Sequence, residues 1–160
     1  MKKVFIDLDL LDSLEERGDL NIQCSYPYHH NNDGVASLRE LAAYAVICRQ
    51  CESPNCVTSC PTEALEKDAE GILRRYNMRC ISCKSCAVAC PFGTIYPEAI
   101  PFLVSRCDYC IDRLAPGEDP LCVSTSPDEL IKYIEIEPDE SKDIHGVGDH
   151  LVVKCKVWKR

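Results

Sequence analysis

The spacing of the cysteines constrains this chain more than any other feature of its 160-residue sequence. Thirteen cysteines are present, and eight of them form two runs that each end in Cys-Pro. The runs are Cys48-x2-Cys51-x4-Cys56-x3-Cys60-Pro61 and Cys80-x2-Cys83-x2-Cys86-x3-Cys90-Pro91. In such a run one loop supplies three thiolates to a [4Fe–4S] cluster, and the fourth thiolate ligates the cluster of a sister run. The spacing therefore predicts two clusters, with the ligand sets Cys48, Cys51, Cys56, Cys90 and Cys80, Cys83, Cys86, Cys60.

A third cysteine group is incomplete, because Ser126 stands where the cysteine of a further Cys-Pro is expected. Two cysteines outside the groups, Cys24 and Cys155, are candidates for the missing ligand. Cys155 alternates with Val153 and Val157 in a strand-like pattern, and a cysteine on such an apolar face is typically a small core residue. The members of the third group are Cys107, Cys110 and Cys122.

Zinc is the alternative metal for these sites. Structural zinc sites favour widely separated Cys-x2-Cys pairs, so the two four-cysteine runs favour iron–sulfur clusters. For the third group, a four-coordinate zinc site that includes Cys24 is the alternative. His29 and His30 lie near Cys24 in the sequence and are further candidates for tuning or ligating a metal centre.

The composition limits both the organic core and the class of partner. Aromatic residues make up only 7% of the chain, so we expect cluster binding to supply much of the cross-linking and to be coupled to folding. The formal net charge of −8 argues against nucleic acid as a partner. The longest apolar run, residues 41–48, is far shorter than the roughly 20 residues of a transmembrane helix.

The cysteine content would also suit a secreted disulfide scaffold. The odd number of cysteines, their cluster-type spacing and the lack of a signal peptide or twin-arginine leader argue against that alternative. We therefore expect a cytoplasmic protein in a reducing, anaerobic setting.

Local patterns in the first part of the chain predict short elements. Residues 4–10 alternate as a strand, residues 14–19 suit a loop or short helix, and residues 23–34 suit a loop. Ser37 to Glu40 have the form of a capping box ahead of a short helix. The following residues, 44–47, would equally suit a strand that enters the first cysteine run.

Around and after the two runs, the pattern predicts mainly turns and strands. Residues 68–71 indicate the turn of a β-hairpin that joins the runs. Each Cys-Pro is followed by a helix-compatible turn, at residues 62–65 and 92–95. In the tail, the predicted strands are residues 133–136 and 151–158, joined by a polar and mobile linker, residues 137–149.

The cysteine motifs carry a resemblance to known proteins. Residues 48–95 resemble a bacterial two-cluster ferredoxin, and the chain up to about Pro138 is similar to the iron–sulfur electron-transfer subunits of multi-subunit redox enzymes. The motifs that carry the second likeness are the two Cys-Pro runs with Cys48-Arg49-Gln50-Cys51-Glu52, then Cys107-Asp108-Tyr109-Cys110 with Arg113, and Pro120-Leu121-Cys122-Val123. The resemblance implies an α+β fold, with a bacterial two-cluster ferredoxin-like core in residues 48–100. A second, degenerate ferredoxin-like lobe would be built from the N- and C-terminal segments, residues 1–47 and 101–160.

This chain departs from the four cysteine groups and four clusters that are typical of that family. Before the first run only Cys24 is present, and Leu14, Arg17 and Leu20 occupy the other three positions of the expected group. In the family, the two outer groups exchange their fourth cysteines, so these three positions and Ser126 make up one complete ligand set. The resemblance therefore implies that one cluster is lost as a unit, from an end of the row, and that side chains refill its space. The remaining set, which would hold a third [4Fe–4S] cluster, is Cys24, Cys107, Cys110 and Cys122.

These observations predict an electron-transfer subunit without a catalytic site of its own, because the sequence shows no nucleotide-binding glycine motif and no phosphate loop. The resemblance implies a separate catalytic oxidoreductase subunit, with a tungsten- or molybdenum-pterin enzyme of the aldehyde oxidoreductase or benzoyl-CoA reductase type favoured. A hydrogenase, formate dehydrogenase or carbon monoxide dehydrogenase partner is the alternative, and a ferredoxin or a further electron-transfer subunit would be an additional partner. Two other functions are a freely diffusing polyferredoxin and a cluster-based enzyme or sensor.

Overall fold

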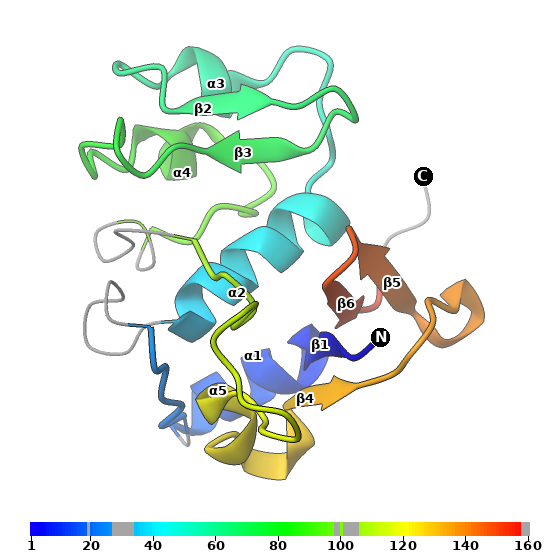
Figure 1. Cartoon of the computed structure of the whole chain (residues 1–160). Helices are drawn as coiled ribbons and strands as arrows, with labels where there is room; N and C mark the ends of the chain where they lie inside the picture. Colours follow the sequence, from blue (N-terminus) through cyan, green and yellow to red (C-terminus); the bar gives the residue numbers. More distant parts are fainter. Residues whose placement is uncertain (19, 27–33, 98–99, 101–105, 158–160) are drawn as a thin grey trace.

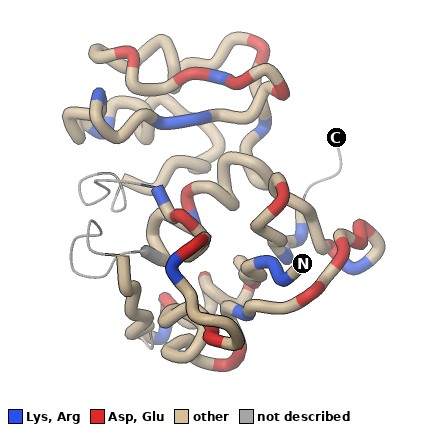
Figure 2. The backbone as a smooth tube through the Cα atoms, viewed as in Figure 1, with Lys and Arg blue, Asp and Glu red and all other residues tan. Residues whose placement is uncertain are grey.

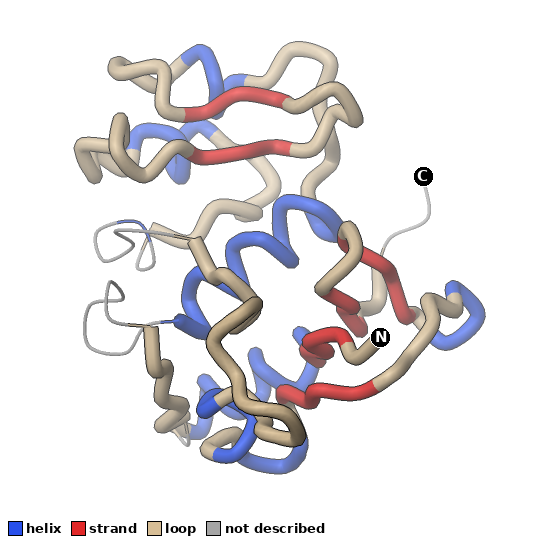
Figure 3. The backbone as a smooth tube through the Cα atoms, in the orientation of Figure 1, coloured by secondary structure: helices blue, strands red, loops and turns tan. Residues whose placement is uncertain are grey.

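The computed structural model describes residues 1–18, 20–26, 34–97, 100 and 106–157. It is a mixed α/β structure with two sheets, one of four strands and one of two. Figure 1 shows the two-stranded sheet at one end of the molecule and the four-stranded sheet toward the other, with helix α2 between them. Figure 3 shows that loops make up much of the remaining chain. Within the described part of the chain, no helix combines the length and the apolar character needed to cross a membrane.

The four-stranded sheet joins the N-terminal and C-terminal segments of the chain. Its strand order is β4-β1-β6-β5, with β1 antiparallel to β4 and parallel to β6. Val4 of β1 pairs with Leu151 of β6, so the two ends of the sequence meet at the centre of this sheet. The strands are β1 (Lys3–Asp7), β4 (Ile131–Ile134), β5 (Ile144–Val147) and β6 (Leu151–Lys154).

Strand β1 ends at Asp7 because this residue caps helix α1 (Leu8–Arg17). The Asp7 carboxylate accepts a hydrogen bond from the Leu10 N–H at 3.1 Å, which satisfies one of the unpaired donors of the first helical turn. The helix ends at Gly18, whose left-handed backbone (φ 75°) favours glycine. The predicted strand over residues 4–10 is therefore too long, and the predicted loop or short helix after it is the second half of α1.

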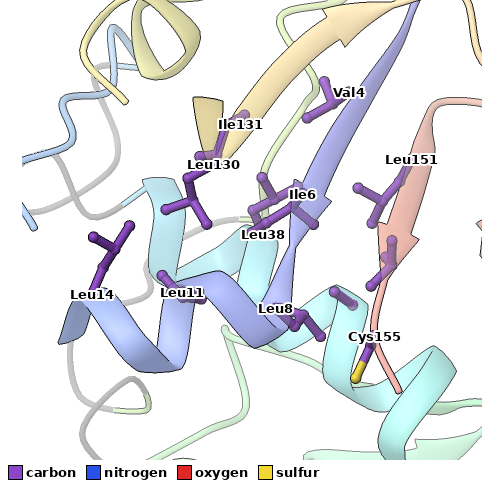
Figure 4. Packing of buried hydrophobic residues seen from close by; sticks show 12 residues of the cluster. Val4, Ile6, Leu8, Leu11, Leu14, Leu38, Leu130, Ile131, Leu151 and Cys155 are labelled. Atoms are coloured by element: carbon purple, nitrogen blue, oxygen red, sulfur yellow. The ribbon is translucent and has the colours of Figure 1, made fainter. Parts of the chain in front are cut away.

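Helix α1 packs its apolar face against the four-stranded sheet. Leu8, Leu11 and Leu14 lie on that face and are buried. Cys155 also belongs to this core, as Figure 4 shows, and its side chain is 5% exposed. The buried members of the core are Val4, Ile6, Leu8, Leu11, Leu14, Leu38, Ala42, Leu130, Ile131, Leu151, Val153 and Cys155.

The predicted capping box at residues 37–40 is wrong, because helix α2 (Gly34–Ala42) begins before it. Ser37 lies inside the helix and is 1% exposed, and its hydroxyl accepts the Cys107 N–H at 2.7 Å. Glu40 lies near the end of α2, and its carboxylate accepts two hydrogen bonds from Arg75. Both polar side chains have partners far away in the sequence, which local patterns cannot reveal. The segment after α2 is the π-helix η2 (Ala43–Ile47), and not the strand that the sequence would equally suit.

The predicted hairpin between the two cysteine runs is confirmed. Strand β2 (Leu65–Lys67) pairs antiparallel with β3 (Leu73–Arg75), and the Asp68 carboxylate accepts the N–H groups of Glu70 and Ile72 within the turn. The short helices α3 (Asn55–Thr58) and α4 (Ser85–Ala89) contact one another. They precede the Cys-Pro pairs, whereas only turns follow them at residues 61–62 and 91–92, so the helical expectation after each Cys-Pro is wrong.

The tail is more ordered than the sequence predicts. Strand β5 lies inside the segment predicted to be a mobile linker, and it pairs antiparallel with β6. Gly146 of β5 packs so closely on Pro138 that a Cβ atom at residue 146 would lie 2.8 Å from the proline Cγ. The remaining elements are α5 (Leu121–Ser124) and the 3₁₀ helices η4 (Pro127–Glu129) and η5 (Glu140–Lys142).

Candidate iron–sulfur centres

A first hollow lies between the two cysteine runs. Its wall includes three cysteines of the first run and the last cysteine of the second, Cys90. The first of these cysteines follows η2 directly, and its N–H donates to the carbonyl of Ala43 at 2.9 Å. This is the combination that the crossover rule predicts. The four cysteines of this first hollow are Cys48, Cys51, Cys56 and Cys90.

A second hollow lies farther along the β2–β3 hairpin, beside Leu65 and Arg75, whereas Lys67 and Leu73 line the first. Its wall includes three cysteines of the second run and the last cysteine of the first, Cys60. Cys83 is exposed to solvent whereas Cys86 is buried, so this hollow has one side close to the surface. The four cysteines of the second hollow are Cys60, Cys80, Cys83 and Cys86.

A third hollow lies between strand β1, helix α2 and the loop that follows residue 106. Ser37 of α2 holds this loop through the Cys107 N–H. The Arg113 guanidinium donates to Cys110 Sγ at 3.3 Å and also to the Asp108 carboxylate, so a cation is fixed beside one of the thiols. The four cysteines of the third hollow are Cys24, Cys107, Cys110 and Cys122.

The first Cys-x-x-Cys loop of each of the three cysteine groups shares one backbone feature that the sequence pattern did not reveal. The residue before the second cysteine has a left-handed backbone in each loop: Gln50 (φ 52°), Ser82 (φ 59°) and Tyr109 (φ 54°). None of the three is a glycine, and the left-handed region costs other residues about 1–2 kcal/mol. The repeated turn therefore stores strain in each loop that presents a pair of thiols to a hollow.

Backbone N–H groups surround the two cysteines that precede proline. Burial acts to raise the pKa of the Cys60 thiol, but the N–H groups of Ala64 and Thr62 lower it overall, with the Ala64 N–H 3.2 Å from the sulfur. At Cys90 burial acts in the same direction, and the N–H groups of Thr94 and Phe92 again lower the pKa. Such donors stabilise the thiolate form, which is the form that ligates iron.

Two thiols of the third hollow have strongly raised pKa values. Burial, together with the neighbouring cysteines, raises the pKa of Cys107 to about 12. The same causes raise the pKa of Cys122 to about 12. Without a bound cation these thiols would stay protonated near neutral pH, so loading this site releases protons.

The donor set of each hollow fits a [4Fe–4S] cluster, because four cysteine thiols line one space and such a cluster takes four thiolates. All thirteen cysteines lie in the described part of the chain, and none of them forms a disulfide bond there. Across the described residues, no three His, Cys, Asp or Glu side chains gather as a site for one metal ion.

The other residues singled out from the sequence have structural contacts. Burial raises the pKa of the Cys155 thiol to about 11, as expected for a core residue. The Ser126 hydroxyl accepts the Ile131 N–H at 2.9 Å and so holds the turn before β4. Leu14 is buried, and Leu20 packs on the same core, so leucine side chains occupy two of the positions where the resemblance places cysteines. His29 and His30 lie outside the described residues.

Comparison with known proteins identifies the family. A family model described as a 4Fe-4S dicluster domain matches residues 40–135. The chain belongs to the 4Fe-4S dicluster domain family. The matched part contains both Cys-Pro runs and the third cysteine group. Iron–sulfur clusters of the [4Fe–4S] type are therefore confirmed as the chemistry of the family, while their number and individual ligands stay predictions.

Curated relatives of this dicluster-family member belong to several reductases. The thiosulfate reductase electron transfer subunit PhsB of Salmonella typhi is 38% identical over 110 residues, which are 68% of this chain and 56% of PhsB. The B subunit of the anaerobic dimethyl sulfoxide reductase of Escherichia coli (strain K12) is 33% identical over 116 residues, which are 72% of this chain and 56% of that protein. The B subunit of the polysulfide reductase of Wolinella succinogenes is 34% identical over 96 residues, which are 59% of this chain and 50% of that protein. The chain spans about half the length of these relatives.

Proposed function

We propose that this protein is an electron-transfer subunit that carries three [4Fe–4S] clusters and exchanges electrons with a separate catalytic subunit. The observation that carries the proposal is the match between cysteines and hollows, since each of the three hollows is lined by four cysteines and no cysteine is shared. When bound, each cluster supplies one-electron chemistry at a potential set by charge, hydrogen bonds to sulfur and exposure.

Contacts between the second and third hollows support an electron path through the protein. The Arg106 guanidinium donates to the carbonyl of Arg75, which lines the second hollow. The next residue after Arg106 is Cys107 of the third hollow, so a side chain and a backbone link bridge the two sites. Ser37 and Glu40, one turn apart on α2, hold Cys107 and Arg75 respectively. The helix therefore fixes the third site relative to the second.

We also propose a position for the cluster that the resemblance implies is lost. In place of the expected cysteines, Leu14 is part of the core and the Ser126 hydroxyl binds a backbone N–H. We propose that this space lies at an end of the row, so that the three remaining clusters still conduct. The N- and C-terminal strands of the four-stranded sheet support the proposed division into a core, residues 48–100, and an outer lobe, residues 1–47 and 101–160.

For the partner, we favour the catalytic subunit of a molybdenum- or tungsten-pterin oxidoreductase. The names of the relatives support a reductase complex, since they are subunits of thiosulfate, dimethyl sulfoxide and polysulfide reductases. A tungsten enzyme of the benzoyl-CoA reductase or aldehyde oxidoreductase type is the finer proposal. A hydrogenase, formate dehydrogenase or carbon monoxide dehydrogenase partner and a freely diffusing polyferredoxin are the alternatives, and the cytoplasmic location stays a prediction.

The test is anaerobic purification of the native protein, followed by gel filtration and metal analysis. We expect it to elute with a larger subunit and with stoichiometric tungsten or molybdenum, at about twelve irons per copy of this chain because each cubane cluster has four. Elution as a single small protein would support the diffusing carrier instead. About eight irons, with two cluster sites shown to be full by spectroscopy, would contradict the third site.

A further inference from the structure

The β2–β3 hairpin presents one cation to each of the first two hollows. In its register, Leu65 pairs with Arg75 at one end and Lys67 pairs with Leu73 at the other. Leu65 and Arg75 line the second hollow, whereas Lys67 and Leu73 line the first. Each candidate cluster site therefore faces one aliphatic and one basic side chain from the same pair of strands. Figure 2 shows the basic residues of β3 beside the mixed charges of β2.

The two cations are held in different ways. Arg75 is 3% exposed, and its guanidinium forms hydrogen bonds to both carboxylate oxygens of Glu40, at 2.5 and 2.8 Å. Burial acts to lower the pKa of Arg75, but Glu40 and, more weakly, the Cys80 thiol raise it overall, so the side chain stays charged. Lys67 is partly buried, and its ammonium donates to the carbonyl oxygen of Cys51. Glu40 of α2 thus fixes the charge of Arg75, and the first cysteine run fixes the charge of Lys67.

Other cations at these hollows are open to solvent. Arg49 lines the first hollow and stacks on the Phe92 ring at 5.4 Å, and Lys84 lines the second, but both side chains are exposed. Water and salt screen exposed charges strongly, whereas a charge in a buried position acts through a lower effective dielectric. Arg75 and Lys67 are therefore the cations with the largest expected influence on the two sites.

Charge near an iron–sulfur cluster changes its reduction potential, because reduction adds a negative charge. A nearby cation favours the reduced form and raises the potential, and a nearby carboxylate has the opposite effect. We propose that Arg75 sets the potential of the cluster held at the second hollow, with Glu40 moderating it, and that Lys67 sets the potential of the cluster at the first. The proposal rests on the proposed function, because it requires a cluster at each hollow.

The test is potentiometry of the purified full-length chain with its clusters loaded, followed by electron paramagnetic resonance. In Arg75→Gln we expect one cluster to become harder to reduce. The equilibrium constant of its redox couple should fall about tenfold, which lowers the midpoint potential by about 59 mV for one electron. In Lys67→Gln we expect a different couple to move in the same direction. The double variant should show both shifts together, since they arise at separate sites.

Two further variants separate the role in tuning from a role in folding. Glu40→Gln keeps the size of the side chain but leaves the Arg75 charge unbalanced, so the couple that Arg75→Gln lowers should now rise. Damage to the fold would instead reduce the iron content in both variants and would not produce shifts of opposite sign. Arg74→Gln is the matched control: Arg74 is the neighbouring residue on β3, its side chain is 47% exposed, and it pairs with Asp68 on the surface. It should leave every midpoint unchanged.

The results distinguish the two proposals. A wild-type chain that binds no [4Fe–4S] clusters would contradict the proposed function. Clusters that are present, with midpoints that do not respond to Glu40→Gln or Lys67→Gln, would contradict the tuning role alone. A shift of the same couple in both Arg75→Gln and Lys67→Gln would also overturn it. If Arg75→Gln fails to fold, the sign of the Glu40→Gln shift decides the role of Arg75.

Discussion

The Cys107 backbone N–H donates to the Ser37 hydroxyl at 2.7 Å, across 70 residues of sequence. Ser37 is buried inside α2, and Cys107 lies in the loop that forms the third hollow. The hydroxyl therefore connects a helix of the N-terminal half to a candidate ligand of the third cluster.

We predict that Ser37→Ala destabilises the protein by about 1–3 kcal/mol, because the Cys107 N–H loses its partner in a buried position. The iron of the third site should be lost first when the protein is exposed to a chelator. Thermal unfolding and timed iron release measure these effects. Ser13→Ala, on the exposed face of α1, is the control and should change neither. Equal iron release from Ser37→Ala and the wild type would contradict the role of the hydroxyl.

Cys24 and Cys155 provide a direct test of the third ligand set. Cys24 lines the third hollow, whereas Cys155 is buried in the core between α1 and β6. We expect Cys24→Ala to damage one cluster and Cys155→Ala to leave all of them intact, with a modest loss of stability from the smaller side chain. Iron analysis and cluster spectra of the two purified variants measure this. The assignment is wrong if Cys155→Ala removes about four irons per chain and Cys24→Ala removes none.

The buried pair of Glu40 and Arg75 should contribute to stability as well as to electrostatics. Their side chains are 13% and 2% exposed. Glu40→Ala leaves the guanidinium without its partner, and we expect a loss of about 3–5 kcal/mol in the free energy of unfolding. The exposed pair of Lys142 and Asp139 is the comparison, and Lys142→Ala should cost less than about 1 kcal/mol. Denaturant unfolding of the loaded protein measures both changes, and similar costs would contradict the distinction.

Gly146 tests whether the segment between β4 and β6 is packed. A Cβ atom there would lie 2.8 Å from Pro138 Cγ, which is closer than real contacts. We expect Gly146→Ala to destabilise the protein by about 1–3 kcal/mol through overpacking. Adding Pro138→Ala should recover part of the loss, because it removes the atom in the way. No effect of Gly146→Ala on the melting temperature would indicate a loosely held segment.

The left-handed position in the cysteine loops can be tested at Ser82. Glycine adopts this conformation at little cost, so Ser82→Gly should be neutral or stabilising. Ser82→Val should cost more than about 1 kcal/mol, because a β-branched side chain clashes in the left-handed region. Ile81→Val introduces the same residue one position earlier and is the control. The strain argument fails if the two valine variants have the same stability and the same iron content.

The sequence by itself determined the features that depend on neighbouring residues. Short spacings within each cysteine run define which thiols one loop can present together. Residues 68–71 form a turn because the Asp68 carboxylate accepts the Ile72 N–H and because Gly71 adopts a left-handed backbone. The hairpin followed from these local signals. The match of the chain to the dicluster family rests on the same motifs.

The tertiary structure decided what depends on contacts between distant segments. Ser37 and Glu40 have the spacing of a capping box, but in the structure they bind Cys107 and Arg75 instead. The pairing of β1 with β6 places Val4 beside Leu151. The same sheet made β5 a strand, because β6 offered it a free edge that no pattern in residues 137–149 reveals. The links made by Ser37, Glu40 and β1 form only when the chain folds, since the free energy that supports them comes from burial and hydrogen bonds between segments that are distant in the sequence.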